Sequence, residues 1–534
     1  MKKVLLALAG VFSLLQISAQ ELQTQFNWHN LDYEKDGVRG MSVERAYQEL
    51  LKGRVSQTVV VGVIDSGVDI EHEDLKSKIW VNTDEIAGNG IDDDKNGFID
   101  DVNGWDFIGG VDGQDVLQEQ LESARLMVKY EKLFGEKPKK RKLKKYREEY
   151  NEYMAIKEEI EQKKKEAAQY LPMYEGLLEN FTNSEKILAA QLNKEEFTKS
   201  EVEAIDDSSV DIKVRQAKKY WLYLANQGAN KAAIEEGVDH FKSQLNYNYN
   251  LNYDARSIVG DNPEKLEYTK YGNNEVIGPR AMHGTHVSGI IGADRSNELG
   301  IKGVADNVKL MVVRTVPNGD ERDKDVANAI RYAADNGAQI INMSFGKPYS
   351  PEKHWVDDAV KYAQSKGVLM IAAAGNDNVD IDVKRHFPTK YYEKGGEADN
   401  WITVGALSYE DGESMTASFS NYGQQTVDVF APGVAIYSTV PGSKYEEKQG
   451  TSMASPAVAG VAALLKSYFP SLTAAQLKQI ILESATDLKD TLVTIPGDNK
   501  EVPFGTLSKT GGVVNAYNAV KMAISITNEP SLGQ

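Results

Sequence analysis

Short apolar segments alternate with amphipathic segments over most of the chain, and no other feature constrains the fold as strongly. We expect strands at 58–64, 308–313, 340–343, 369–374, 402–406 and 427–430, and helices at 323–336, 355–366, 452–468 and 474–483. Near-continuous apolar strands between helices are typical of a parallel sheet covered on both faces. The sequence therefore predicts an α/β fold, in which functional residues gather at the carboxyl ends of the strands.

Composition narrows the class of protein. The chain has 534 residues, of which 41% are hydrophobic and 26% charged, so it can form a buried core and more than one folding unit. Its net charge of -18 disfavours nucleic acid and anionic membrane surfaces as partners. It has no cysteine, which excludes disulfides, thiolate metal sites and a lipid-modified N-terminal cysteine.

The N-terminus has the pattern of a signal peptide over residues 1–19. Lys2 and Lys3 precede the apolar stretch 4–15, and 17–19 (Ile-Ser-Ala) is a plausible cleavage site. The apolar stretch is shorter than the roughly 20 residues that a spanning helix needs. We therefore expect export, to the periplasm or the exterior, with no integral membrane segment after cleavage. An uncleaved anchor or a buried helix is the alternative.

Residues 116–249 differ in character from the rest, being rich in Lys, Glu, Gln, Tyr and Ala and poor in Gly. Apolar residues there recur at spacings near three and four, at Leu143, Tyr146, Tyr150, Tyr153 and Ile156 and again at Ala217, Tyr220, Leu224 and Ala225. This spacing predicts amphipathic helices, and hence an all-helical insertion. The basic run 139–145 is followed at once by acidic residues, which favours a solvated helix face over a nucleic-acid patch.

Three polar residues stand at the ends of expected elements. Ser452 lies in a Gly-Thr-Ser turn before an apolar helix, Asp65 ends an apolar strand, and His283 opens another apolar helix. A serine at a helix start is normally a cap that accepts from free backbone N–H groups. Together with the aspartate and the histidine, however, it completes the set of groups that a nucleophilic acyl-transfer site requires.

The chain resembles the subtilisin-like serine proteases over about 59–106 and 282–523. The resemblance rests on VIDSGV at 63–68, HGTHV at 283–287, INMSFG at 341–346, AAAGN at 372–376, APG at 431–433 and GTSMASP at 450–456. It implies a subtilisin-like three-layer α/β fold with a mostly parallel central sheet. The catalytic domain would comprise 20–115 and 250–526, interrupted by the helical insertion 116–249 and followed by a tail at 527–534.

The resemblance also implies roles for the polar residues. Ser452 would be the nucleophile, His283 the general base, and Asp65 the group that orients the imidazole. The Asn376 amide and the Ser452 backbone N–H would hold the oxyanion, although an asparagine at a strand end is also a common turn residue. His286, about one helical turn beyond His283, is expected to be structural.

Two short runs are expected to bind substrate. They are Ser344, Phe345 and Gly346, which would pair with the substrate backbone, and Ala373, Ala374 and Gly375, which would complete the wall of the main side-chain pocket. Members of the family commonly have a small residue before an aromatic-Pro pair at the base of this pocket. Here His386 precedes Phe387 and Pro388. If His386 reaches the pocket, it would disfavour large apolar side chains; otherwise it lies on an ordinary surface loop.

An acidic stretch at 92–100 suggests a metal site. Asp92, Asp94 and Asn96 alternate as oxygen ligands do in an EF-hand-like loop, Gly97 allows the turn, and Asp100 could contribute directly or through water. We expect Ile99 to anchor the loop. Asn103 occupies the position of the closing glutamate, so the match is incomplete. The prediction is a structural calcium ion, and the alternative is an acidic turn without metal.

The sequence thus predicts an exported serine endopeptidase that acts on polypeptides, with an oligomeric state that stays open. Two alternatives remain: a catalytically idle scaffold that binds peptides or partners, and a peptidase limited to short peptides. The insertion would cover the cleft or support folding, or else serve as a peripheral docking arm.

Overall fold

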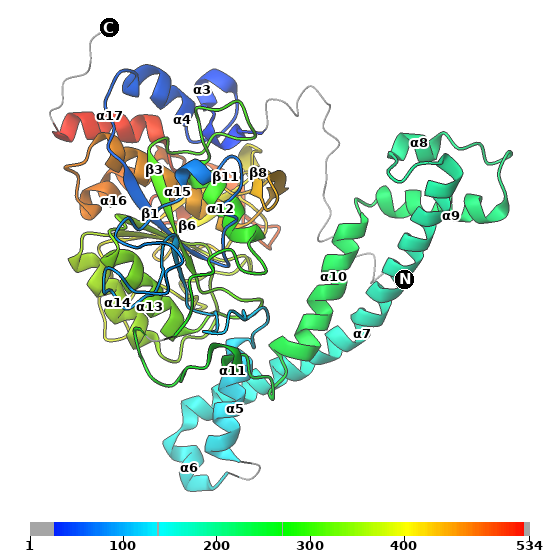
Figure 1. Cartoon of the computed structure of the whole chain (residues 1–534), viewed down its shortest axis with the longest axis horizontal. Coiled ribbons are helices and arrows are strands. Elements are labelled where there is room, and N and C mark those ends of the chain that lie inside the picture. The colour runs from blue at the N-terminus through cyan, green and yellow to red at the C-terminus, as the bar shows by residue number, and fades with distance from the viewer. Residues whose placement is uncertain (1–25, 136–137, 270, 528–534) are drawn as a thin grey trace. The chain divides into compact units, whose positions relative to one another are not determined.

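The computed structural model describes residues 26–135, 138–269 and 271–527, and the predicted signal peptide lies outside them (Figure 1). The chain divides into two compact units. One is Ser123–Tyr253, and the other consists of the described residues before and after it. No helix in the described part of the chain is long and apolar enough to cross a membrane.

A nine-stranded sheet forms the centre of the larger unit. Every neighbouring pair of strands is parallel except β10 and β13, which are antiparallel. The expected α/β fold is therefore confirmed. In spatial order the strands are β10 (Thr486–Asp487), β13 (Gly512–Val513), β7 (Val429–Pro432), β6 (Trp401–Leu407), β5 (Leu369–Ala373), β4 (Ile340–Met343), β1 (Val59–Asp65), β3 (Val308–Arg314) and β2 (Gly104–Asp106).

Helices cover the two faces of the sheet, as the alternation of side chains in β1 shows. Val61 and Val63 are buried in the core with residues of α12 (Met282–Gly292) and α15 (Thr451–Tyr468). Gly62 points the other way, where a Cβ would lie 3.0 Å from Ala333 of α13 (Asp323–Asp335). Since successive residues of a strand face opposite sides, α12 and α15 cover one face and α13 covers the other. Figure 1 shows α14 (Lys353–Ser365) alongside α13.

The α15 helix lies in the centre of the core. Every one of its residues is buried except Ser452, its second residue, and Lys466 near its end. Such a helix is apolar all round because all of its sides meet other elements. The remaining elements of this unit are α3 (Tyr33–Asp36), α4 (Val43–Ala46), η2 (Tyr47–Leu51), α11 (Arg256–Val259), β8 (Ile436–Val440), β9 (Lys444–Lys448), α16 (Ala474–Glu483), β11 (Leu492–Thr494), β12 (Glu501–Pro503) and α17 (Ala516–Thr527), together with the short 3-10 turns η1 (Trp28–Asn30), η3 (Lys76–Lys78), η5 (Gly412–Ser414) and η6 (Phe504–Thr506).

The smaller unit is helical throughout. Its elements are α5 (Glu122–Phe134, whose first residue belongs to the larger unit), α6 (Lys140–Lys145), α7 (Arg147–Leu192), α8 (Lys199–Glu203), α9 (Ile212–Ala225), α10 (Lys231–Ser243) and η4 (Gln244–Asn248). Both α9 and α10 pack against the long α7 (Figure 1). Of the predicted apolar stripes, Tyr153, Ile156, Ala217 and Leu224 are buried. Leu143 lies in a separate helix, because the backbone leaves the helical region at Tyr146.

The chain enters the helical unit later than the expected boundary at residue 116. Val116 is buried in the larger unit, where its N–H donates to the Ile108 carbonyl (3.1 Å) and its own carbonyl accepts from Arg314 (2.9 Å). The compact helical unit spans Ser123–Tyr253 instead of 116–249. The composition changes near residue 116, but the backbone stays bound to the sheet for several residues more.

Candidate active site

Three parallel strands bring the predicted polar residues to one edge of the sheet. Asp65 is the last residue of β1, Ser344 directly follows β4, and Asn376 follows β5. These strands are neighbours in the order β5-β4-β1, so their carboxyl ends meet at the same edge. His283 and Ser452 are the second residues of α12 and α15.

Asp65 and His283 form a direct pair. The imidazole Nδ1 of His283 lies 2.7 Å from Asp65 Oδ1, which also accepts from the Ser66 N–H at 2.8 Å. Asp65 is buried, whereas 39% of the His283 side chain is exposed. Burial lowers the pKa of His283, but the charge of Asp65 and the hydrogen bond to it raise the pKa by more, so it lies above the ordinary histidine value. Among the described residues, the His283 ring makes this one hydrogen bond, through Nδ1.

Close backbone contacts and one buried arginine hold this pair in place. A Cβ at Gly284 would lie 2.1 Å from the Gly67 carbonyl oxygen, so only glycine lets the start of α12 approach the turn after β1. Arg314, at the end of β3, donates from Nε to the Ser66 carbonyl at 3.1 Å. The same buried guanidinium is paired with Asp106 and Asp115. The turn that carries Asp65 is therefore fixed from two sides.

Ser452 stands next to Ser344 and does not cap its helix. No side-chain cap is present at the start of α15. The Ser452 hydroxyl donates to the Ser344 carbonyl at 3.0 Å, and the Ser344 hydroxyl donates to the Ser452 carbonyl at 3.0 Å. Ser344 and His283 line the same cleft, which has a volume of about 390 Å³. Ser452 is therefore hydrogen-bonded to a residue that lines the cleft with His283, and its hydroxyl is bonded to Ser344 and not to His283.

A chain of hydrogen bonds links Ser452 to Asn342 and Ser455, two buried residues to which no role was assigned from the sequence. Ser455 Oγ donates to Asn342 Oδ1 at 2.8 Å, and Asn342 Nδ2 donates to Ser344 Oγ at 2.9 Å. The last link is the bond from Ser344 to the Ser452 carbonyl. The available signal was Asn342 itself, because a single amide in an apolar strand must find a partner when it is buried.

Asn376 is oriented by the start of α15. Its Oδ1 accepts from the Thr451 N–H and the Thr451 hydroxyl, both at 2.9 Å, which identifies the oxygen of the amide. Its Nδ2 then faces Gly450. A Cβ at Gly450 would lie 3.4 Å from that Nδ2 and 3.6 Å from the Ser452 backbone nitrogen. Two N–H donors therefore converge on one point beside Ser452, which is the arrangement that an oxyanion requires.

The two predicted substrate-binding runs differ in the hydrogen bonds that their backbones make. Among the described residues, neither Phe345 nor Gly346 makes a backbone hydrogen bond, and pairing resumes only at Lys347. Ala373 and Ala374 are buried, and the Ala374 N–H donates to the Val404 carbonyl inside the sheet. The first run can thus accept an added strand, whereas the second is a wall.

His286 lies away from this chemistry. It is buried, and its Nε2 donates to the Glu446 carbonyl at 3.0 Å. Burial lowers the pKa of His286 to about 3, so the ring is neutral at all ordinary pH values. Its hydrogen bond attaches the hairpin of β8 and β9 to α12.

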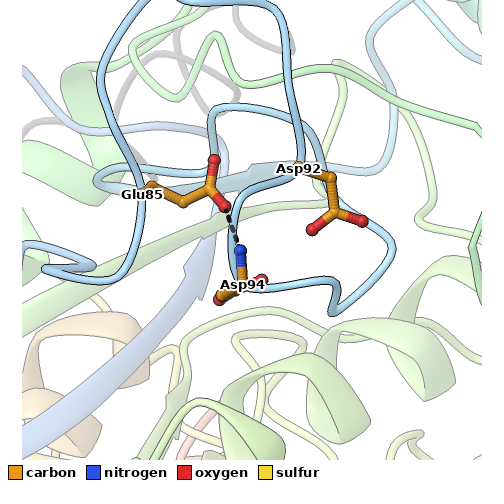
Figure 2. Close-up of side chains that lie close together, drawn as sticks. All are labelled: Glu85, Asp92 and Asp94. Carbon is orange, nitrogen blue, oxygen red and sulfur yellow. Dashed lines mark hydrogen bonds between the residues drawn. The ribbon is translucent and has the colours of Figure 1, made fainter.

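The acidic loop gathers three carboxylates that could hold a metal ion. They belong to Glu85, Asp92 and Asp94, and one oxygen of each lies within 4.8 Å of the others. Figure 2 shows them around the loop, with the Asp94 N–H donating to Glu85. Glu85 is buried and was missed by the sequence analysis because it lies outside the acidic run. A donor set of carboxylates alone fits a hard cation.

Asn96 and Asp100, which were also expected as ligands, make hydrogen bonds within the same loop. Asn96 Oδ1 accepts from the Phe98 N–H at 2.8 Å, and the carboxylate of Asp100 accepts from the N–H groups of Asn89 and Gly90. The loop is anchored by Phe98, whose buried ring lies edge-on to Trp105. The expectation that Ile99 is the anchor is wrong, since that side chain is exposed.

Comparisons with known proteins give one consistent result. The family model described as the subtilase family matches residues 56–495. The thermophilic serine proteinase of Bacillus sp. (strain AK1) is 37% identical over 296 residues, which are 55% of this chain and 62% of that protein. Thermitase of Thermoactinomyces vulgaris is 35% identical over 309 residues, 57% of this chain and 93% of that protein. Subtilisin DY of Bacillus licheniformis is 39% identical over 210 residues, 39% of this chain and 72% of that protein. The match thus spans less than two thirds of the first relative and nearly all of thermitase.

Proposed function

The chain belongs to the subtilase family, and from this premise we propose that it is an exported serine endopeptidase that cleaves polypeptides through an acyl-enzyme. The observation that carries the proposal is the convergence of four groups at one sheet edge: the hydrogen-bonded pair of Asp65 and His283, the hydroxyl of Ser452 bonded to Ser344 of the cleft that His283 lines, and the amide of Asn376 beside Ser452. A binding scaffold has no need for all four. The export part of the proposal rests on the predicted signal peptide over 1–19.

The geometry supports a sequence of steps for the reaction. The Ser452 hydroxyl turns from the Ser344 carbonyl to Nε2 of His283, which takes its proton as Oγ attacks the substrate carbonyl. Asp65 accepts from Nδ1 and stabilises the imidazolium. His283 then protonates the leaving amine, which leaves an acyl group on Ser452. Water, deprotonated by His283, hydrolyses this ester and restores the hydroxyl.

Two hydrogen-bond donors can stabilise the negative charge that develops on the substrate oxygen. Asn376 Nδ2 and the Ser452 backbone nitrogen lie 3.4 and 3.6 Å from one point beside Gly450. The Thr451 contacts hold the amide in this orientation before substrate binds, so no reorganisation is needed. An asparagine donor of this kind contributes roughly 3–4 kcal/mol to transition-state stabilisation in subtilisin.

Covalent labelling with a fluorophosphonate tests the proposal. We expect the secreted, mature protein to be labelled and the Ser452→Ala variant to remain unlabelled. Because only neutral His283 can take the proton, the labelling rate should rise with pH through a midpoint above the ordinary histidine pKa. Absence of labelling in correctly folded protein would support the idle scaffold instead. Labelling without cleavage of casein, but with cleavage of short chromogenic peptides, would restrict the enzyme to short substrates.

We also propose that the ion at Glu85, Asp92 and Asp94 is calcium. Calcium takes about six to eight oxygen ligands, so water and further backbone oxygens would complete the shell. The three carboxylates repel each other, and a cation between them removes this repulsion. Burial raises the pKa of the neighbouring Asp101 to about 6, and the charge of Asp94 adds a smaller contribution in the same direction.

Removal of calcium is expected to destabilise the larger unit. For a site that binds only the folded state, free calcium at 100 times Kd stabilises by about 2.7 kcal/mol. In the Ser452→Ala background, which prevents self-digestion, EGTA should therefore lower the thermal midpoint, and Glu85→Gln with Asp92→Asn should abolish the response. Asp84→Asn is the matched control, since this exposed carboxylate is next to Glu85 and outside the cluster. An unchanged midpoint in EGTA would rule out a structural calcium ion at this site.

A further inference from the structure

The imidazole of His386 lies between the two runs that we propose as substrate-binding walls. A Cβ at Gly346 would lie 2.1 Å from His386 Nε2, and a Cβ at Gly375 would lie 2.7 Å from His386 Cε1. The ring is therefore in contact with the backbone of both walls at once. Gly346 and Gly375 follow the neighbouring strands β4 and β5, and Ser344, which accepts from Ser452, lies two residues before Gly346. In the proposed function, the space between these two walls would take the substrate side chain.

Backbone pairing holds His386 in this position. The next residue, Phe387, exchanges two backbone hydrogen bonds with Lys347, each 2.9 Å long, and Lys347 directly follows Gly346. The Lys347 side chain is buried and paired with Glu122 and Asp323 at 2.8 and 2.9 Å. On the other side, the Asn421 N–H donates to the Gly375 carbonyl at 2.9 Å. Both walls and the residue between them are thus attached to the core.

The imidazole of His386 fills space between the two walls and carries no charge. Its Nε2 is buried and has no hydrogen-bond partner among the described residues. Burial lowers the pKa of His386, although the exposed Asp377 nearby raises it, and the net effect is a lowered pKa. At neutral pH the imidazole is therefore uncharged and gives an acidic side chain no ion pair. A long or aromatic side chain would have to displace a ring that is packed between two backbones.

We propose that His386 makes the main side-chain pocket shallow, so that the enzyme cleaves after small residues such as glycine, alanine and serine. This inference rests on the proposed function and specifies its substrate class. His386 belongs to neither wall. It would determine the side-chain preference by occupying the volume that a larger substrate side chain would need.

Cleavage of matched peptides that differ only before the scissile bond tests the proposal. For the wild type, kcat/KM for alanine should exceed that for phenylalanine and leucine roughly tenfold or more, since each methylene in such a pocket is worth about 10–200-fold. His386→Gly should raise kcat/KM for phenylalanine by at least about tenfold and change that for alanine little. His386→Leu fills a similar volume without a polar atom and should keep the preference for alanine. Arg385→Gly is the matched control, because this neighbouring side chain is exposed and should leave the profile unchanged.

The outcomes separate this inference from the proposed function. A wild-type preference for phenylalanine, leucine or glutamate in protein that fluorophosphonate labels would overturn the inference and leave the enzyme assignment intact. A preference lost in His386→Leu would show that the nitrogen atoms matter instead of the volume, which also overturns it. Protein that is neither labelled nor active would overturn the proposed function. If His386→Gly does not fold, the cleavage profiles of the wild type and of His386→Leu still test the inference.

Discussion

Replacing Ser452 with alanine is expected to lower kcat for peptide hydrolysis on the order of 10⁶-fold, which is the loss subtilisin shows without its nucleophile. His283→Ala should cost about as much, and the double variant no more than either single variant. The reason is that the two side chains act in one proton transfer, so losing one already disables the other. Steady-state kinetics on a peptide chosen from the cleavage profile, with KM measured separately, checks this.

The neighbouring histidine provides the control for that measurement. His286 is buried one helical turn away and donates to the Glu446 carbonyl. His286→Gln keeps a side-chain N–H donor and should retain kcat within about tenfold of the wild type, an effect far below that of removing a group that transfers the proton. Additive losses in the Ser452 and His283 double variant, or equal losses at both histidines, would contradict the roles assigned here.

Lys390→Met is expected to destabilise the larger unit by about 3–5 kcal/mol, because it leaves the buried carboxylate of Asp428 without its cation. Lys390 and Asp428 are both buried and lie 2.8 Å apart, and Asp428 also accepts from the Thr403 N–H at 2.8 Å. The ion pair ties the segment that carries His386 to β7. Equilibrium unfolding in denaturant, in the Ser452→Ala background, measures the change in free energy.

Two further variants make this result interpretable. The exposed pair Lys361 and Asp358, 3.7 Å apart on α14, is the matched control, and Lys361→Met should change stability by less than about 1 kcal/mol. Adding Asp428→Asn to Lys390→Met should recover part of the loss, since a neutral amide oxygen can still accept from Thr403. A loss below about 1 kcal/mol in Lys390→Met would mean that water reaches the carboxylate.

The fold and the identity of the polar site residues could be predicted from the sequence because their signals are local. The six strands expected at 58–64, 308–313, 340–343, 369–374, 402–406 and 427–430 are near-continuous apolar runs. Asp65 stands at the end of one of them, and His283 and Ser452 stand at the starts of apolar helices. Glu85 gave no such signal, because its part in the acidic cluster depends on how the chain folds back onto 92–94. Asn342 was quoted within a motif, but only the structure shows its partners on α15 and after β4.

Local bonds explain why the group of three carboxylates differs from the predicted ligand set. The alternation of Asp92, Asp94 and Asn96 is typical of a metal loop, yet Asn96 turns its oxygen to the Phe98 N–H two residues on. A short amide side chain commonly binds nearby backbone in this way. The compact helical unit begins at Ser123 and not at 116. The backbone at Val116 is bound by Arg314, which is distant in the sequence, so local composition could not place this boundary.

The burial of α15 has a consequence for how activity is lost under stress. Ser452 is a half-buried residue at the start of a helix whose other residues, apart from Lys466, are buried. Amide hydrogens in such a helix exchange only when the whole domain opens. Catalytic competence should therefore persist, as denaturant rises, until the cooperative unfolding transition itself. The proposed nucleophile would then lie on a slowly exchanging element, and inactivation and unfolding of the larger unit would be a single event.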